Sequence, residues 1–391
     1  MSERVAARAR RAVVGVLFGA IIGLGAAGSS GCEGEGELRD PLPPRSTETL
    51  CLASLDLDDV DGTMPALLSE TGCFVDTPTE APAADMIPFG VNAELWTDGA
   101  HKARFVAIPA GSTITLTDEG PWQLPVGSKI VKAFRLDVVT GTADEPVVTR
   151  VPVETRVMVL GSEGWHYYSY MWNDERTDAS LMPAGMARVV PYEAEVDGER
   201  RAISYQFPDR YSCTTCHGDA PGEVIGLRTR QLNGRYDYDG VRANQLEALE
   251  SIGVFTAPLP EDVDALPRQP NPFGKKGTLE QRARAYLDTH CASCHQPGGW
   301  TAGDINLDLR YETHLAETNL CGERSLYPYP SGTGQYRLRP GKPEESNILG
   351  RMGVEGVGEI GEMPPLGRSI ADQEGIALIR AWIESMSVCP E

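Results

Sequence analysis

Hydrophobic and polar positions alternate through residues 83–210, where short runs of β-branched and aromatic residues are separated by Gly, Pro and Asp. This pattern is typical of antiparallel strands. Asp197 and Gly198 stand between two such runs and predict a tight hairpin. We therefore expect an antiparallel β-sandwich or barrel in this region. The other runs cover residues 101–109, 112–117, 129–139, 154–160 and 165–172.

The pattern changes after residue 210, where apolar positions recur at helical spacing. Thr278 and Gln281 have the spacing of a capping box ahead of a helix that leads into Cys291. Ser369 and Asp372 suggest a second box before a C-terminal helix, and residues 239–255 also have a helical pattern. One face of the last helix would carry Ile376, Ile379, Ile383 and Met386. The sequence thus predicts a mainly α-helical C-terminal region.

The first 31 residues have the pattern of a secretory signal, with a basic start, an apolar run and small residues before Cys32. The apolar run is short for a membrane span of about 20 residues. Cys32 resembles the lipidated cysteine of a bacterial lipobox, although Ser29 replaces the usual leucine. We expect an exported chain, lipid-anchored to the membrane through Cys32 and facing the periplasm or the cell surface.

Length and charge narrow the class of protein. A chain of 391 residues predicts more than one domain. The formal net charge of −21 argues against nucleic acid as a partner and favours basic or neutral proteins.

Nine cysteines divide into three groups. Cys32 belongs to the lipobox-like segment, and four cysteines form two repeated pairs. An even remainder in an exported protein suggests two disulfides, although four cysteines allow three pairings and could also remain buried thiols. Closeness in sequence favours Cys51 with Cys73 and Cys321 with Cys389.

The repeated pairs are both followed by histidine, in the pattern C-x-x-C-H. This is the attachment pattern of c-type haem. Thiols three residues apart lie on one side of a helical turn, where they can join the two vinyl groups of one porphyrin. The histidine that follows becomes the proximal iron ligand. We therefore expect two covalently bound haem c groups, at Cys213, Cys216 and His217 and at Cys291, Cys294 and His295.

Two other interpretations of the pairs are weaker. A thioredoxin-like redox pair needs a βαβ setting, and the surrounding pattern does not predict one. Four cysteines could bind zinc. However, 78 residues separate Cys213 from Cys291, and zinc gives no reason for a histidine after each pair.

The order of helix, C-x-x-C-H, loops, a methionine beside prolines and a final helix resembles class I cytochrome c. The resemblance implies that His295 is the proximal ligand and Met363, ahead of two prolines, the distal one. Met352 competes, but its apolar neighbours favour a place in the core. The first haem has no equally simple solution, and its iron could also be five-coordinate. Its candidate sixth ligands are Met171, Met182, Met186, His101, His166, His290 and His314.

Residues 65–387 as a whole resemble a family of exported bacterial diheme c-type cytochromes that carry an N-terminal β-rich module. The resemblance implies electron transfer between redox partners, one of which would present a basic patch to this acidic chain. A diheme peroxidase-like enzyme, or the haem subunit of a periplasmic dehydrogenase, is the alternative, with an electron carrier favoured over a catalyst.

The expected fold is multidomain α+β, with a β-sandwich-like module before a mainly α-helical cytochrome c region. The expected parts are a signal peptide (1–31), a tether with a small disulfide-linked segment (32–82), the β-rich module (83–210), a first haem-binding segment (211–275) and a class I cytochrome c-like domain (276–391).

Overall fold

The structure is a computed structural model that describes residues 40–117, 120–217, 225–301, 305–329 and 334–391. The expected signal peptide and Cys32 lie outside these ranges. Residues 40–391 group into one compact unit. Within the described ranges, no helix has the length and apolar character needed to cross a bilayer.

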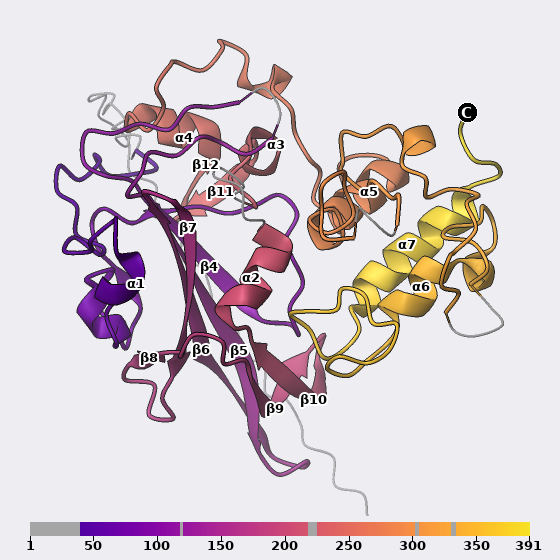
Figure 1. Cartoon of the computed structure of the whole chain (residues 1–391), viewed down its shortest axis with the longest axis horizontal. Helices are drawn as coiled ribbons and strands as arrows, with labels where there is room; N and C mark the ends of the chain where they lie inside the picture. The colour runs from indigo at the N-terminus through magenta and orange to yellow at the C-terminus, as the bar shows by residue number, and fades with distance from the viewer. Residues whose placement is uncertain (1–39, 118–119, 218–224, 302–304, 330–333) are drawn as a thin grey trace, which may run out of the picture. The chain divides into compact units, whose positions relative to one another are not determined.

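An eight-stranded antiparallel sheet dominates the fold (Figure 1). The strand order is β10-β9-β5-β6-β7-β8, and β4 pairs with β5 and with β3. Asp197 and Gly198 both have positive φ, of 54° and 79°, and form the predicted hairpin turn between the last two strands. The strands are β3 Ile87–Pro88, β4 His101–Ala107, β5 Lys129–Gly141, β6 Pro146–Gly161, β7 Gly164–Trp172, β8 Ala179–Leu181, β9 Arg188–Val196 and β10 Glu199–Phe207.

Both faces of this sheet are covered, because alternate residues of its central strands enter two different cores. Val131 and Val157 pack with the disulfide-linked N-terminal segment. Ile130 and Met158, each one residue away, pack with residues 227–266. The expected sandwich is therefore wrong: a single sheet is buried on both sides by loops, short helices and two-stranded hairpins. These hairpins are β1 Phe74–Asp76 with β2 Ala81–Pro82, and β11 Arg235–Tyr238 with β12 Val241–Asn244.

The strand expected over residues 112–117 is also wrong. Ile114 makes only an isolated bridge with Phe255, and Thr115 one with Gln123. The backbone of Ile114 bonds to Val254 and Thr256, so this run joins the loop layer above the sheet.

The C-terminal region is not mainly helical, and the expected fold class is corrected accordingly. Strands hold 27% of the chain and helices 20%. Turns and loops separate the helices, and residues 241–244 form a strand where a continuous helix was expected. The α-helices are α1 Val60–Thr63, α2 Arg210–His217, α3 Thr229–Leu232, α4 Gln245–Ser251, α5 Leu279–His290, α6 Asn347–Met352 and α7 Gln373–Ser385. Single 3₁₀ turns occur at Leu68–Thr71, Val263–Ala265, Leu315–Glu317 and Pro343–Glu345.

Helices α5 and α7 pack against each other through one apolar cluster. The capping box of Thr278 and Gln281 begins α5 as predicted. A close approach occurs at Gly375 of α7, where a Cβ atom would lie 2.3 Å from the hydroxyl oxygen of Tyr286. Glycine is required there because no side chain fits between the two helices.

The cap of α7 differs from the prediction. Asp372 accepts a hydrogen bond from the backbone of Gly375 at 2.9 Å, so Asp372 itself is the N-cap. Ser369 instead binds the buried carboxylate of Asp98, with its backbone at 2.7 Å and its hydroxyl at 3.0 Å. This carboxylate ties the segment before α7 to the segment before β4.

Two disulfides close the expected loops. Cys51 is bonded to Cys73, and Cys321 to Cys389. The first lies in the core beneath the sheet, and the second joins the end of the chain to a loop beyond the second C-x-x-C-H motif.

Candidate functional site

The first motif occupies α2, which lies against β7 (Figure 1). Asp209 precedes the helix and accepts a hydrogen bond from the backbone of Ser212 at 2.7 Å. Cys213 and Cys216 are one helical turn apart, so both thiols are on one side of α2, as the haem interpretation requires. Both are free thiols.

His217 ends α2 as a half-buried residue whose Nδ1 atom is buried, and its ring centre lies 5.4 Å from that of Tyr167. Burial first, and then the charges of Lys132 and Arg156, lower the pKa of His217 to about 3. The ring is therefore neutral at ordinary pH and keeps a lone pair. Its Nδ1 atom has no hydrogen-bond partner among the described residues. A buried polar nitrogen without a partner is costly, and this is consistent with a site built for a further group.

The second motif follows α5 directly. Cys291 is the C-cap residue of the helix, and its carbonyl accepts hydrogen bonds from the backbones of Cys294 and His295 at 3.2 and 2.9 Å. This tight turn brings Cys291, Cys294 and His295 together.

A single hydroxyl group fixes the tautomer of His295. Thr301 donates its only hydroxyl hydrogen to the carbonyl oxygen of Cys294 at 2.9 Å. Its oxygen lies 3.0 Å from Nδ1 of His295, so that oxygen accepts a hydrogen bond from Nδ1–H. The Nε2 atom then carries the free lone pair, the arrangement found in metal-binding histidines. Burial, with Arg337 and Arg351, lowers the pKa of His295 to about 4 and keeps the ring neutral.

A cavity of ≈ 470 Å³ opens beside this histidine. Its volume lies within the range of about 300–1,000 Å³ that is usual for small-molecule and cofactor sites. The wall is predominantly apolar, with two guanidinium groups. Its residues include Cys291, His295, Ile305, Leu307, Leu309, Leu320, Tyr327, Arg337, Ile348, Arg351, Met352 and Met363.

Both candidate methionines reach this cavity. Met363 lies in a loop after a glycine turn, whereas Met352 ends α6 and is also packed in the apolar core, as expected. The structure therefore places Met363 on the same cavity as His295, and it places Met352 there as well. The assignment of Met363 as distal ligand stays a prediction.

The two motifs meet in space although they are far apart in sequence. The thiol of Cys294 donates to the backbone carbonyl of Thr215 at 3.6 Å. It also forms a hydrogen bond with the thiol of Cys216, which lowers the pKa of Cys216 to about 7 and raises that of Cys294. Burial raises the pKa of Cys291 to about 12 and raises that of Cys213.

This contact brings the motifs together only at their neighbouring edges. In the described part of the chain, no three His, Cys, Asp or Glu side chains converge as a metal-binding group. A structural zinc site uses four convergent ligands. The described thiols instead form two separate pairs, each with its own histidine.

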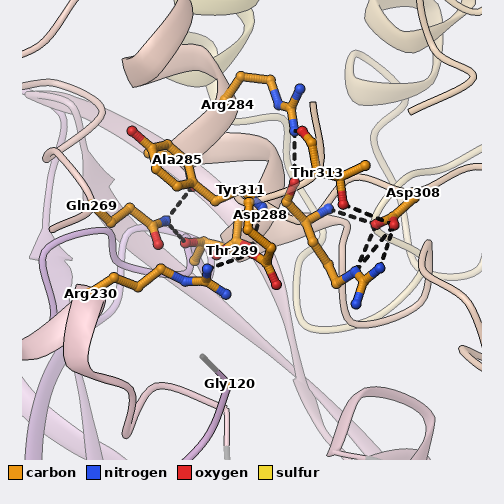
Figure 2. Close-up of polar contacts among 12 residues, drawn as sticks. Gly120, Arg230, Gln269, Arg284, Ala285, Asp288, Thr289, Asp308, Tyr311 and Thr313 are labelled. Atoms are coloured by element: carbon orange, nitrogen blue, oxygen red, sulfur yellow. Dashed lines mark hydrogen bonds and ion pairs between the residues drawn. The ribbon is translucent and has the colours of Figure 1, made fainter. Parts of the chain in front are cut away.

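A polar network holds α5 and its motif in place (Figure 2). The backbone of Tyr311 donates to the carboxylate of Asp288 at 2.9 Å, and Arg230 lies beside this carboxylate. Gln269 donates to the carbonyl of Ala285 at 3.0 Å. Since Arg230 belongs to α3, this network links α5 to the chain that follows the first motif.

The candidates for a sixth ligand of the first iron are mostly engaged elsewhere. His290 uses Nδ1 to donate to the carbonyl of Tyr286, and its Nε2 accepts from the backbone of Trp96, both at 2.9 Å. It therefore has no free lone pair. His101 pairs with Asp137 at 2.9 Å. Met182 is packed in an apolar core, and the sulfur of Met171 accepts a hydrogen bond from an arginine. Met186 is exposed on the surface.

The donor set fits the predicted cofactor at both motifs. Each has two free thiols one turn apart and a neutral, half-buried histidine, and the second adds an apolar cavity with a thioether. Sequence reasoning missed Thr301, because a threonine six residues after a histidine gives no distinctive signal. The comparisons identify no matching protein family, curated protein or solved structure.

Proposed function

We propose that the protein is an exported diheme c-type cytochrome that carries electrons between redox partners. The observation that carries the proposal is the contact between the two motifs at Cys216, Thr215 and Cys294. Because the two attachment sites are in contact through these residues, they would hold their cofactors close enough for electrons to pass within one chain.

The chain's residues have distinct parts in this proposal. Cys213 and Cys216 form one pair of thioether links, and Cys291 and Cys294 form the other. His217 and His295 supply neutral imidazole ligands. Met363 would offer a thioether on the same cavity as His295, and such ligation raises the potential of an iron centre. Haem, when bound, supplies an iron that alternates between ferric and ferrous states.

The proposal includes export and a membrane anchor at lipidated Cys32. The partners would be redox proteins, one with a basic patch that complements the net charge of −21. Globomycin-sensitive processing and labelling by a radioactive fatty acid, both abolished by Cys32→Ser, would test the anchor.

Haem counting tests the central claim. The full chain, expressed with a c-type maturation system, should retain two haems after denaturation, by mass and by pyridine haemochrome. Cys213→Ala/Cys216→Ala and Cys291→Ala/Cys294→Ala should each lose one. Thr214→Ala, in the filler of the first motif, is the matched control and should keep both. A chain without covalent haem would refute the proposal.

The enzymatic alternative makes a different prediction for the same sample. A peroxidase-like site needs an iron with an open distal face. Cyanide should then bind the ferric first haem within seconds, and hydrogen peroxide should be consumed with a partner reductant. An electron carrier should consume no hydrogen peroxide, and cyanide should not bind an iron whose sixth position a protein ligand fills.

A further inference from the structure

Three cations stand side by side on one face of the sheet. In the registers of β4, β5 and β6, Arg104 lies opposite Lys132, which lies opposite Arg156. Directly opposed residues of antiparallel strands have Cβ atoms about 4.5–5.5 Å apart, and like charges placed in this way are destabilising. A row of this kind needs compensating negative charge.

Two carboxylates serve only the ends of this row. Glu94 accepts a hydrogen bond from Arg104 at 3.1 Å. Glu154 accepts two from Arg156, both at 2.9 Å. Glu154 is fully buried and also accepts from two hydroxyl groups, at 2.6 and 2.8 Å. Both of its oxygens are thus occupied.

Lys132, in the middle, has no carboxylate in ion-pair contact within the described ranges. Its ammonium group lies 5.8 Å from the centre of the Phe134 ring, and the charge of Glu154 acts on it without forming an ion pair. Lys102 and Arg156 lie over the same ring, at 5.8 and 4.6 Å. With Lys102 included, four basic side chains face two carboxylates. Burial lowers the pKa of Lys102 and of Lys132 to about 7, so the surplus of two positive charges is complete only when both lysines are protonated.

The row faces the first motif. Lys132 and Arg156 both act electrostatically on the Cys213 and Cys216 thiols and on the imidazole of His217. Tyr167, which packs beside His217, stands on the same sheet face as the row, opposite Met158. The cations therefore lie on the face of the sheet that is directed toward α2.

We infer that the row Arg104–Lys132–Arg156 is an anion site that receives the two propionate carboxylates of a haem attached at Cys213 and Cys216. This inference rests on the proposed function. Ammonium and guanidinium groups make their strongest hydrogen bonds to carboxylates. Two carboxylates match the surplus of two charges. The β-rich region is then a wall of the first haem site, and its sheet supplies the cations, because Arg210 of α2 is already paired with Asp61.

The decisive experiment asks whether Lys132 stabilises the protein when the first haem is attached and destabilises it when that haem is missing. Lys132→Met is made in the full chain and in the chain that carries Cys213→Ala/Cys216→Ala. Unfolding by urea is followed in each. With the first haem present, the substitution should lower the denaturation midpoint, because it removes a partner of the propionates. Without that haem, it should raise the midpoint, because it removes an uncompensated cation.

The matched control is Lys129→Met. Lys129 is a buried lysine of the same strand, but it belongs to the opposite sheet face, where it pairs with Ala107 and Val159. Its effect should be equal in the two backgrounds. If Lys132→Met also has equal effects, the inference is wrong while haem counting still supports the proposed function. If mass shows no haem at the first motif, both fail together.

A second measurement covers the case in which the haem-deficient chain does not fold. In the fully loaded protein, Lys132→Met should lower the midpoint potential of the first haem, because a nearby positive charge favours the added electron. Lys129→Met should leave it in place, and an unchanged potential in Lys132→Met would overturn the inference.

Inorganic phosphate distinguishes the source of the anion. At constant ionic strength, phosphate should raise the midpoint of the haem-deficient chain in a Lys132-dependent way and leave the loaded chain unaffected. Equal stabilisation of both would show that a free anion occupies the row, and would overturn the assignment to propionates.

Discussion

The guanidinium of Arg368 donates a hydrogen bond to the backbone carbonyl of Met363 at 2.9 Å. The same side chain donates to the carbonyls of Val354 and Ile370, at 2.9 and 3.2 Å. Arg368 is only 4% exposed, so these bonds form out of contact with water. One buried cation therefore fixes the loop that carries the predicted methionine ligand.

Replacing Arg368 by Gln should loosen this loop. The shorter side chain cannot reach three carbonyls, and buried carbonyls left without partners cost about 1–3 kcal/mol each. We expect the free energy of unfolding to fall by about 3 kcal/mol in urea titrations. Arg380→Gln is the control, because Arg380 forms an exposed ion pair with Glu344, and its loss should change stability by less than about 1 kcal/mol. Equal losses in both variants would show that Arg368 does not anchor the loop.

Met363→Ala should remove the weak sulfur-to-iron band of the oxidised, haem-loaded protein. It should also lower the potential of the second haem, because thioether ligation favours ferrous iron. Met352→Ala is the matched variant on the same cavity, and it should keep the band while losing about 2–5 kcal/mol of stability from the core. Loss of the band in Met352→Ala alone would reverse the assignment.

Thr301→Val should change the electronic character of His295. The substitution keeps the shape of the side chain but removes the oxygen that accepts from Nδ1–H. A histidine ligand that loses this acceptor becomes a weaker donor to the metal. We therefore expect a higher potential for the second haem, measured by spectroelectrochemical titration. Thr313→Val, which removes a hydroxyl bound to Asp308, should leave this potential unchanged.

His290 should make stability depend on pH. Burial lowers the pKa of His290 to about 4, below the usual value of about 6.5 for the unfolded chain. Between these values the unfolded chain binds a proton that the folded chain excludes. Stability should therefore fall as pH falls from 6.5 to 4, by on the order of 3 kcal/mol. His290→Gln should reduce the slope of this part of the profile measured by urea unfolding, to which His217 and His295 also contribute through their lowered pKa values, and should leave the slope above pH 7 unchanged. A profile that keeps its wild-type slope would contradict the assignment.

Electron transfer should respond to the sign of the reactant's charge. With a net charge of −21, the chain should attract cationic redox reagents, and salt should screen this attraction over about 8–10 Å. Stopped-flow reduction by a cationic ruthenium complex should therefore slow as ionic strength rises. Reduction by an anionic iron complex should instead become faster as ionic strength rises, because salt also screens its repulsion. Rates that are equal for both signs at low salt would place the acidic residues away from the haem edges.

Local signals in the sequence predicted part of the fold. The helix into Cys291 followed from the Thr278 capping box, while the haem sites at the two C-x-x-C-H motifs stay a prediction. The hairpin at Asp197 followed from its turn chemistry. Each of these depends on residues that are neighbours in the chain.

What sequence could not supply depends on long-range contacts. The apolar residues of β5 alternate between two cores, so their pattern did not distinguish one doubly covered sheet from two stacked sheets. The helical spacing of residues 239–255 continued through Val241–Asn244, where pairing with β11 prevails over local preference. Arg104, Lys132 and Arg156 become neighbours only through the pairing register of three strands. Their positions in the sequence therefore gave no signal of the cation row.

If haem is attached at both motifs as proposed, the contact between Thr215 and Cys294 would also set an order for biosynthesis. In the folded chain all four motif thiols are partly buried, and each motif turns one thiol toward the other. On the proposed function, a maturation enzyme would need each motif open to join a macrocycle to it, and the contact between the motifs would restrict this access. Attachment would therefore precede the meeting of the two segments. A chain that folded without the first haem would then bury the row Arg104–Lys132–Arg156 without the propionates that balance its charge.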